Sequence, residues 1–175
     1  MWGKKYILVV FMIQFCFLSN IVWSQNIFTF KLCNNEINFD ISKENITDLF
    51  PNIYSELDNR IKDIEYLSLE MKTESDFYFC LITFSFFKNK LYNIKIQNSS
   101  DNNVSDEIIE LTSLFKKVGE VPNEIEALDV YNNTIIYQKG NLKLSMTDYS
   151  HFTFCFIKDE TIEKEIKKQY PDFEN

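Results

Sequence analysis

The segment 77–87 (FYFCLITFSFF) places the tightest limit on the fold, because it is the most apolar stretch after residue 24. A short apolar run bounded by turn residues is typical of a buried strand. A strand with apolar side chains on both faces is covered on both sides of its sheet. We therefore expect a central strand here, with Phe77, Phe79 and Leu81 on one face and Tyr78, Cys80, Ile82, Phe84 and Phe86 on the other.

Several other segments alternate apolar and polar residues with the two-residue period of a strand. A hairpin is expected over 27–41, with Asn34 and Asn35 as its turn. Strands over 65–71 and 91–97 are expected on either side of the central segment. Four short strands, with turns at Asn132-Asn133 and Gly140-Asn141, are expected near 126–131, 134–139, 142–147 and 152–157.

Apolar residues at spacings of three and four predict four helices. The first follows Ser42, whose side chain can cap it, and a second continues to residue 63. The third covers 105–118 and ends at Gly119, which can adopt the left-handed C-cap conformation. The last begins after Asp159 and ends at Pro171.

This order of elements predicts an α+β fold, in which two to four helices pack on a mainly antiparallel sheet. The helices and strands also fall into two groups, each a helix followed by three or four strands. We therefore expect a tandem repeat of one helix and then three strands, although the two groups share no residue pattern that can be aligned.

The first residues have the order of a secretory signal peptide. Lys4 and Lys5 precede an apolar run over 6–18, and Val22-Trp23-Ser24 places small residues around a cleavage site. The alternative is an uncleaved membrane anchor, but a spanning helix needs about 20 apolar residues. We expect 1–24 to be removed, which leaves a single domain over 25–175 in the periplasm or outside the cell, with no membrane span.

The charge of the chain argues against a nucleic-acid partner. The net charge is −8, and removal of two lysines with the signal peptide would make it −10. Nucleic-acid affinity comes largely from clustered lysine and arginine. Arg60 is the only arginine, and no basic cluster is visible along the sequence.

Three cysteines follow residue 24: Cys33, Cys80 and Cys155. An odd number cannot all pair within one chain, although export permits one disulfide. Cys80 with Cys155 is the favoured pair, because both are expected in the middle of strands. The alternative is that these thiols are free and behave as small buried apolar groups.

No arrangement of residues predicts a catalytic site, a cofactor or a metal. His151 is the only histidine and lies four residues before Cys155, too far along a strand for a local dyad. Asp101, Asn103 and Ser105 have the spacing of a calcium loop, but the glycine and the closing glutamate of such a loop are missing. The acidic segment 120–129 is expected to be a solvated loop.

These observations favour a non-enzymatic module that binds another protein in the cell envelope or the extracellular space. An acidic protein would associate faster with a basic partner. One alternative is a carrier of small ligands, because Phe and Tyr fill the expected strands and could line a cavity. A hydrolase is a further alternative, and it would need His151 or two acids to meet in a cleft.

Overall fold

The structure is a computed structural model that describes residues 28–58, 60–72, 79–99, 104–125, 130–149 and 152–173. The expected signal peptide and His151 lie outside these residues. So do Asp101 and Asn103 of the expected calcium spacing. The predictions made for them stay predictions.

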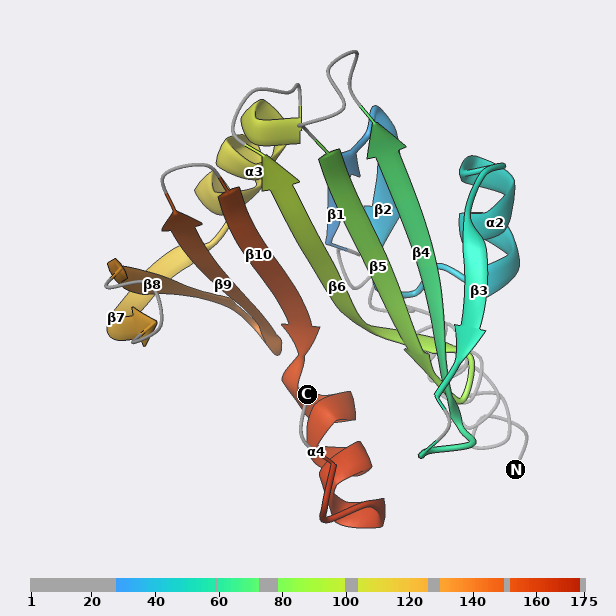
Figure 1. Ribbon diagram of the computed structural model, residues 1–175. Helices are drawn as coiled ribbons and strands as arrows, with labels where there is room; N and C mark the ends of the chain where they lie inside the picture. The colour runs from blue at the N-terminus through green and yellow to red at the C-terminus, as the bar shows by residue number, and fades with distance from the viewer. Residues whose placement is uncertain are drawn as a thin grey trace, which may run out of the picture.

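One eight-stranded sheet dominates the molecule (Figure 1). All of its neighbouring strands are antiparallel, in the order β3-β4-β5-β6-β10-β9-β8-β7. The strands are β3 (Tyr54–Leu57), β4 (Ile64–Lys72), β5 (Phe79–Phe87), β6 (Lys90–Ser99), β7 (Lys116–Ile125), β8 (Val130–Lys139), β9 (Leu142–Tyr149) and β10 (Phe152–Asp159). The expected antiparallel sheet with helices is therefore confirmed.

The sheet consists of two meanders that meet at its centre. Strands β3 to β6 form one meander, β7 to β10 form the other, and β6 pairs with β10 between them. The described helices are α2 (Lys43–Leu49), α3 (Val104–Ser113) and α4 (Glu160–Gln169). Four strands follow α2 and four follow α3, so the expected three-strand repeat is not confirmed.

One face of the sheet is covered by α2, α3 and the hairpin of β1 (Thr29–Leu32) and β2 (Asn35–Asn38), as Figure 1 shows. Apolar side chains from these elements and from the sheet share one large core. Ile82, Ile94, Ile96 and Ile157 lie in it and are fully buried. The two-residue period of each strand sends the intervening side chains to the opposite, open face.

Helix α4 packs on the open face, at one end of the sheet (Figure 1). Asp159 caps it by accepting hydrogen bonds from the backbone N–H groups of Thr161 and Ile162, at 2.8 and 3.2 Å. A second, small core forms beneath it from Ile61, Ile64, Phe87, Tyr92, Ile166 and Phe173. Because α4 is short, the middle of the open face stays uncovered.

Two helix predictions are wrong in part. The expected helix to residue 63 is replaced by edge strand β3, whose last residue, Leu57, is 67 % exposed. The third helix ends at Ser113 instead of 118, and Gly119 lies at a bulge in β7. In both places the chain instead forms a strand at an edge of the sheet. The spacing of nearby residues does not reveal such pairing with a distant strand.

The turn and strand predictions near the C-terminal half also need correction. Asn132 and Asn133 lie inside β8 rather than in a turn, and Glu120 lies in β7 rather than in a loop. Gly140 does form the expected turn, with a φ of 60°. No helix in the described part of the chain is both long and apolar enough to cross a bilayer.

Candidate functional site

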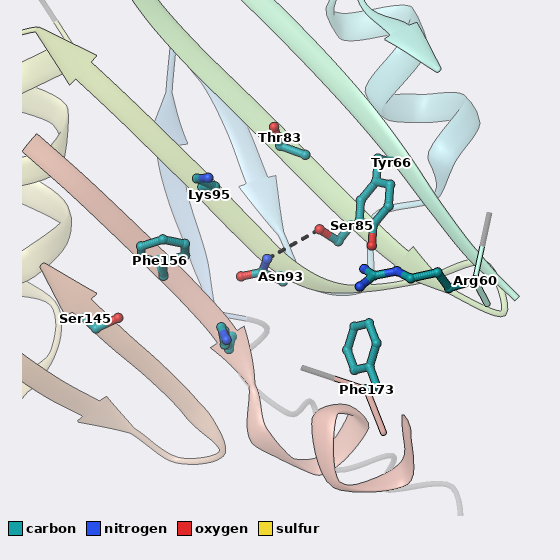
Figure 2. A pocket seen from close by; sticks show the side chains of 10 residues that line it. Arg60, Tyr66, Thr83, Ser85, Asn93, Lys95, Ser145, Phe156 and Phe173 are labelled. Atoms are coloured by element: carbon teal, nitrogen blue, oxygen red, sulfur yellow. Dashed lines mark hydrogen bonds between the residues drawn. The ribbon is translucent and has the colours of Figure 1, made fainter. Parts of the chain in front are cut away.

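The uncovered middle of the open face contains a pocket of about 510 Å³, which we call the open-face pocket (Figure 2). Side chains from five strands line it, together with one residue before β4 and one after α4. They are Arg60, Tyr66, Thr83, Ser85, Asn93, Lys95, Ser145, Phe156, Lys158 and Phe173.

Strand register explains why these residues gather. Directly paired residues on neighbouring strands point to the same face. Pairing aligns the lining residues of β4, β5, β6, β9 and β10 in two adjacent rows. One row is Thr83, Lys95, Phe156 and Ser145, and the other is Tyr66, Ser85, Asn93 and Lys158.

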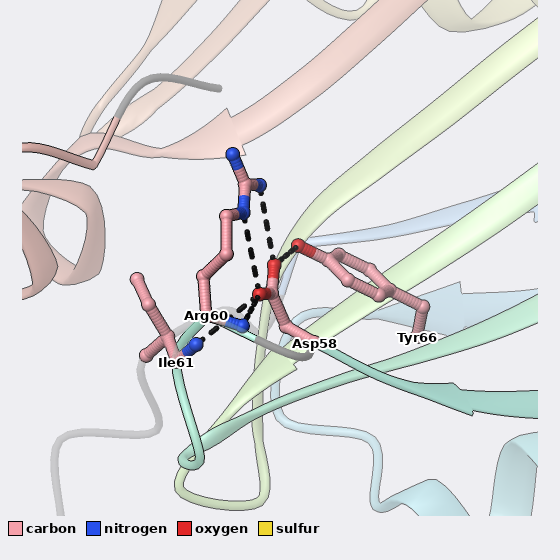
Figure 3. Close-up of polar contacts among 4 residues, drawn as sticks. All are labelled: Asp58, Arg60, Ile61 and Tyr66. Carbon is pink, nitrogen blue, oxygen red and sulfur yellow. Dashed lines mark hydrogen bonds and ion pairs between the residues drawn. The ribbon is translucent and has the colours of Figure 1, made fainter.

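Asp58 organises one wall of the pocket (Figure 3). Its carboxylate accepts hydrogen bonds from Tyr66 Oη at 2.8 Å, and from the backbone N–H groups of Arg60 at 2.6 Å and Ile61 at 3.1 Å. The Arg60 guanidinium lies 3.4 Å from Asp58 Oδ2. The side chain of Asp58 is only 4 % exposed, whereas that of Arg60 is 72 % exposed. Asp58 therefore anchors Arg60 without lining the pocket.

These contacts set the charge state of Asp58. Burial opposes its ionisation, but the hydrogen bonds from Tyr66, Arg60 and Ile61 outweigh burial and lower its pKa to about 2. Burial and the adjacent Asp58 carboxylate raise the pKa of Tyr66 to about 12. At neutral pH the wall therefore consists of an anionic Asp58, a neutral Tyr66 hydroxyl and a cationic Arg60.

The two lysines of the pocket differ in their surroundings. Lys95 is half-buried, and its ammonium lies 5.7 Å from the centre of the Phe156 ring. Lys158 Nζ lies 3.9 Å from Glu163 on α4, and its side chain is 22 % exposed. Burial lowers the pKa of Lys158, Glu163 opposes that change, and Lys167 and Lys143 add to it.

Asn93 leaves a polar atom without a partner. It is 9 % exposed, and its Nδ2 donates a hydrogen bond to Ser85 Oγ at 3.3 Å. Its Oδ1 is buried and has no hydrogen-bond partner among the residues that the structure describes, and Figure 2 shows it pointing away from Ser85. An unsatisfied buried polar group costs about 1–3 kcal/mol. Asn93 lines the pocket, so a rotation of its amide would let a bound molecule donate a hydrogen bond to this acceptor.

The expected Cys80–Cys155 disulfide is absent from the structure, where Cys33, Cys80 and Cys155 are free thiols. Cys80 lies on β5 and Cys155 on β10, and β6 runs between these strands. Two strand spacings, about 9–10 Å, exceed the Cα separation of a disulfide. Cys33 Sγ instead lies 3.8 Å from Met71 Sδ. None of the three cysteines lines the pocket.

Of the other candidates from the sequence, the structure describes Glu120 and Ser105. Glu120 is exposed and pairs with Lys117 at 2.9 Å, and residues 126–129 of the same acidic segment lie outside the described part of the chain. Ser105 accepts a hydrogen bond from Asn98 Nδ2 at 3.0 Å. No group of three or more His, Cys, Asp or Glu side chains in the described ranges could hold a metal ion.

Sequence reasoning did not find the open-face pocket, because its charged residues are far apart in the chain. Arg60, Lys95 and Lys158 lie on or near three different strands, and no basic cluster marks them. One signal was available. Lys95 stands between Ile94 and Ile96, which are fully buried on one face of the sheet. The alternation of the strand therefore places the Lys95 ammonium on the opposite face.

Comparison with known proteins adds no relative. No family model matches this chain, and no curated protein or solved structure matches it either.

Proposed function

We propose that this protein is a non-enzymatic binding protein and that the open-face pocket holds its ligand, a small polar molecule. Pockets for small molecules commonly measure about 300–1,000 Å³ and contain a few converging polar groups. The open-face pocket has both properties. The observation that carries the proposal is the buried Asn93 Oδ1 on its floor, which lacks a partner.

The chemistry of the lining supports binding rather than turnover. Nucleophilic catalysis needs a nucleophile beside a general base. Among the residues that the structure describes, those that line the open-face pocket include hydroxyls and amines but no carboxylate, imidazole or thiol. The proposal also changes the carrier alternative drawn from the sequence, because eight of the ten described lining residues carry a polar group, which favours a polar ligand over an apolar one.

The protein-binding module stays a second candidate. On edge strand β7, Val118 and Val121 are 56 % and 50 % exposed, which favours contact with a partner. However, β7 also contains a bulge at Gly119 and a proline at Pro122, features that prevent another strand from pairing with a sheet edge. We therefore place ligand binding first.

Isothermal titration calorimetry with the full chain tests the proposed function. Its ligands are a panel of neutral sugars, amino acids, organic acids and phosphates. Ser145→Phe fills the pocket from β9, and Ser55→Phe makes the same change on exposed strand β3. We expect at least one panel member to bind the wild type and the Ser55→Phe variant but not the Ser145→Phe variant. Equal binding by both variants, or no binding by the wild type, would refute the proposal.

We also propose that the protein acts after export, because residues 1–24 have the order of a signal peptide. The intact mass of the protein recovered from its native cells tests this. A chain that begins at Gln25 supports export, and a chain that retains Met1 contradicts it.

A further inference from the structure

We propose that the ligand of the open-face pocket is a small anion, a carboxylate or a phosphate, that also carries a hydroxyl or N–H donor. Arg60, Lys95 and Lys158 bind the negative charge, and Asn93 accepts the donor. The inference rests on the proposed function, because it names the class of molecule that the pocket holds.

The distribution of charge is the first argument. Acidic residues outnumber basic ones in this chain, 26 against 18, so a lining of average composition would contain more carboxylates than amines. Among the described lining residues the open-face pocket reverses that balance, because three are cationic and none is acidic, and the one carboxylate of the wall, Asp58, lies behind Arg60. Clefts lined by one sign of charge concentrate ligands of the opposite sign.

Lys95 is the second argument. It is half-buried on the pocket floor, and among the described residues it has no carboxylate partner. The structure gives the Lys95 ammonium a cation–π contact with Phe156, whose ring centre lies 5.7 Å away. A partly desolvated ammonium without a counter-ion is stabilised by an anion that binds beside it.

Lys158 adds charge to the same floor. Glu163 on α4 faces it at 3.9 Å, but that carboxylate also pairs with Lys167 at the shorter distance of 3.0 Å. Lys143 is its direct cross-strand partner on β9. Lys167 therefore competes with Lys158 for Glu163, and burial combined with the nearby Lys167 and Lys143 lowers the pKa of Lys158. An anion in the pocket would relieve this repulsion.

Asn93 defines the rest of the ligand. Its Oδ1 needs a donor, which a bare phosphate or carboxylate lacks at neutral pH. A hydroxyl or N–H group beside the anionic group supplies that donor once the Asn93 amide rotates toward the pocket. The rings of Phe156 and Phe173 offer apolar surface for the carbon skeleton of the ligand. A phosphorylated sugar and a hydroxy acid both combine these features.

Large polyanions fit the molecule poorly. The pocket has room for a single small molecule, and Phe173, which follows α4, lines one side of it. The net charge of −8 on the whole chain repels an extended anionic chain. The anion is therefore a small molecule rather than a nucleic acid.

Calorimetric titration of the full chain with four probes tests the inference. The probes are inorganic phosphate, L-malate, glucose 6-phosphate and glucose. Malate and glucose 6-phosphate distinguish a carboxylate from a phosphate, and glucose is the uncharged counterpart of glucose 6-phosphate. We expect malate or glucose 6-phosphate to bind at least about 10-fold more tightly than glucose, because hydrogen bonds to charged groups are the stronger kind. Affinity should also fall as salt is added.

Lys95→Met is the key variant, and Lys139→Met is its matched control. Lys139 also lies over a ring, 4.3 Å from the centre of Phe28, but it is exposed and outside the pocket. We expect Lys95→Met to weaken binding of the preferred anion about 10- to 100-fold. Lys139→Met should leave that affinity unchanged. Asn93→Leu should weaken malate or glucose 6-phosphate more than inorganic phosphate.

The outcomes separate this inference from the proposed function. Glucose that binds as tightly as glucose 6-phosphate, or a Lys95→Met variant with wild-type affinity, overturns the anionic ligand. The proposed function survives that result if Ser145→Phe still blocks the bound probe. Where Ser145→Phe blocks no probe, the pocket itself is not the binding site and both proposals fail.

Discussion

Replacing Asp58 with asparagine removes one charge from the wall of the open-face pocket while it preserves the shape of the side chain. The carboxylate is 4 % exposed and accepts hydrogen bonds from Tyr66, Arg60 and Ile61. Its pKa falls from 3.8 to about 2 on folding. A tenfold change in a proton-binding constant corresponds to about 1.4 kcal/mol, so the ionised form contributes about 2 kcal/mol to the free energy of unfolding near pH 7.

The sign of the pH dependence follows from the direction in which folding moves this pKa. A carboxyl whose pKa is lower in the folded state stabilises the fold at pH values above its unfolded pKa of 3.8. That contribution is lost as the pH falls from 3.8 through about 2, because the unfolded chain then binds the proton more readily than the folded chain does. Asparagine cannot ionise, so the Asp58→Asn variant lacks this component at every pH.

Urea unfolding of both proteins, followed by far-UV circular dichroism across the acidic range, measures the effect. We expect the difference in the free energy of unfolding to shrink by about 2 kcal/mol between neutral pH and pH near 2, because protonation removes the advantage of the wild type. Asp40→Asn, on an exposed turn, is the control and should show no such change. A difference between wild type and Asp58→Asn that stays constant with pH would refute the reasoning.

Three further predictions concern the core, the last helix and the thiols. Ile96→Ala, in the middle of the large core, should lower the free energy of unfolding by about 2–5 kcal/mol in urea titrations, and a loss below about 1 kcal/mol would contradict the described packing. Asp159→Ala removes the cap of α4 and should cost about 0.5–2 kcal/mol in the same assay, whereas an unchanged stability would count against the cap. Burial raises the pKa of Cys33, Cys80 and Cys155 to about 12, so iodoacetamide should modify all three in denaturant but react slowly with the native protein. A Cys80–Cys155 disulfide would instead leave only Cys33 to react.

The central strands could be predicted from sequence because each carries its own signal. The apolar run in β5 and the alternation in β4 and β6 identify strands regardless of what surrounds them. The caps at Ser42 and Asp159 are similarly local, because each side chain accepts a hydrogen bond from an N–H group two or three residues ahead. Each of these features depends only on residues a few positions apart in the chain, so each can be recognised from the sequence alone.

The edges of the sheet and the pocket could not be predicted in the same way. Ile53, Leu57, Ile61 and Ile64 have helical spacing, but pairing with β4 draws Tyr54–Leu57 into an edge strand. The pocket depends on pairs such as Lys95 with Phe156, which are far apart in the chain. Only the meeting of β6 with β10 brings them together, and no local pattern specifies that pairing.

The most direct test of the account is a titration of the isotopically labelled full chain with glucose 6-phosphate, followed by amide ¹H–¹⁵N correlation spectra. We predict saturable shifts that centre on the amides of Thr83, Lys95 and Phe156, with little change in β1 and α2 on the covered face. Shifts that do not saturate, or that centre on the covered face, would contradict the claim that the open face of the sheet binds a small anion.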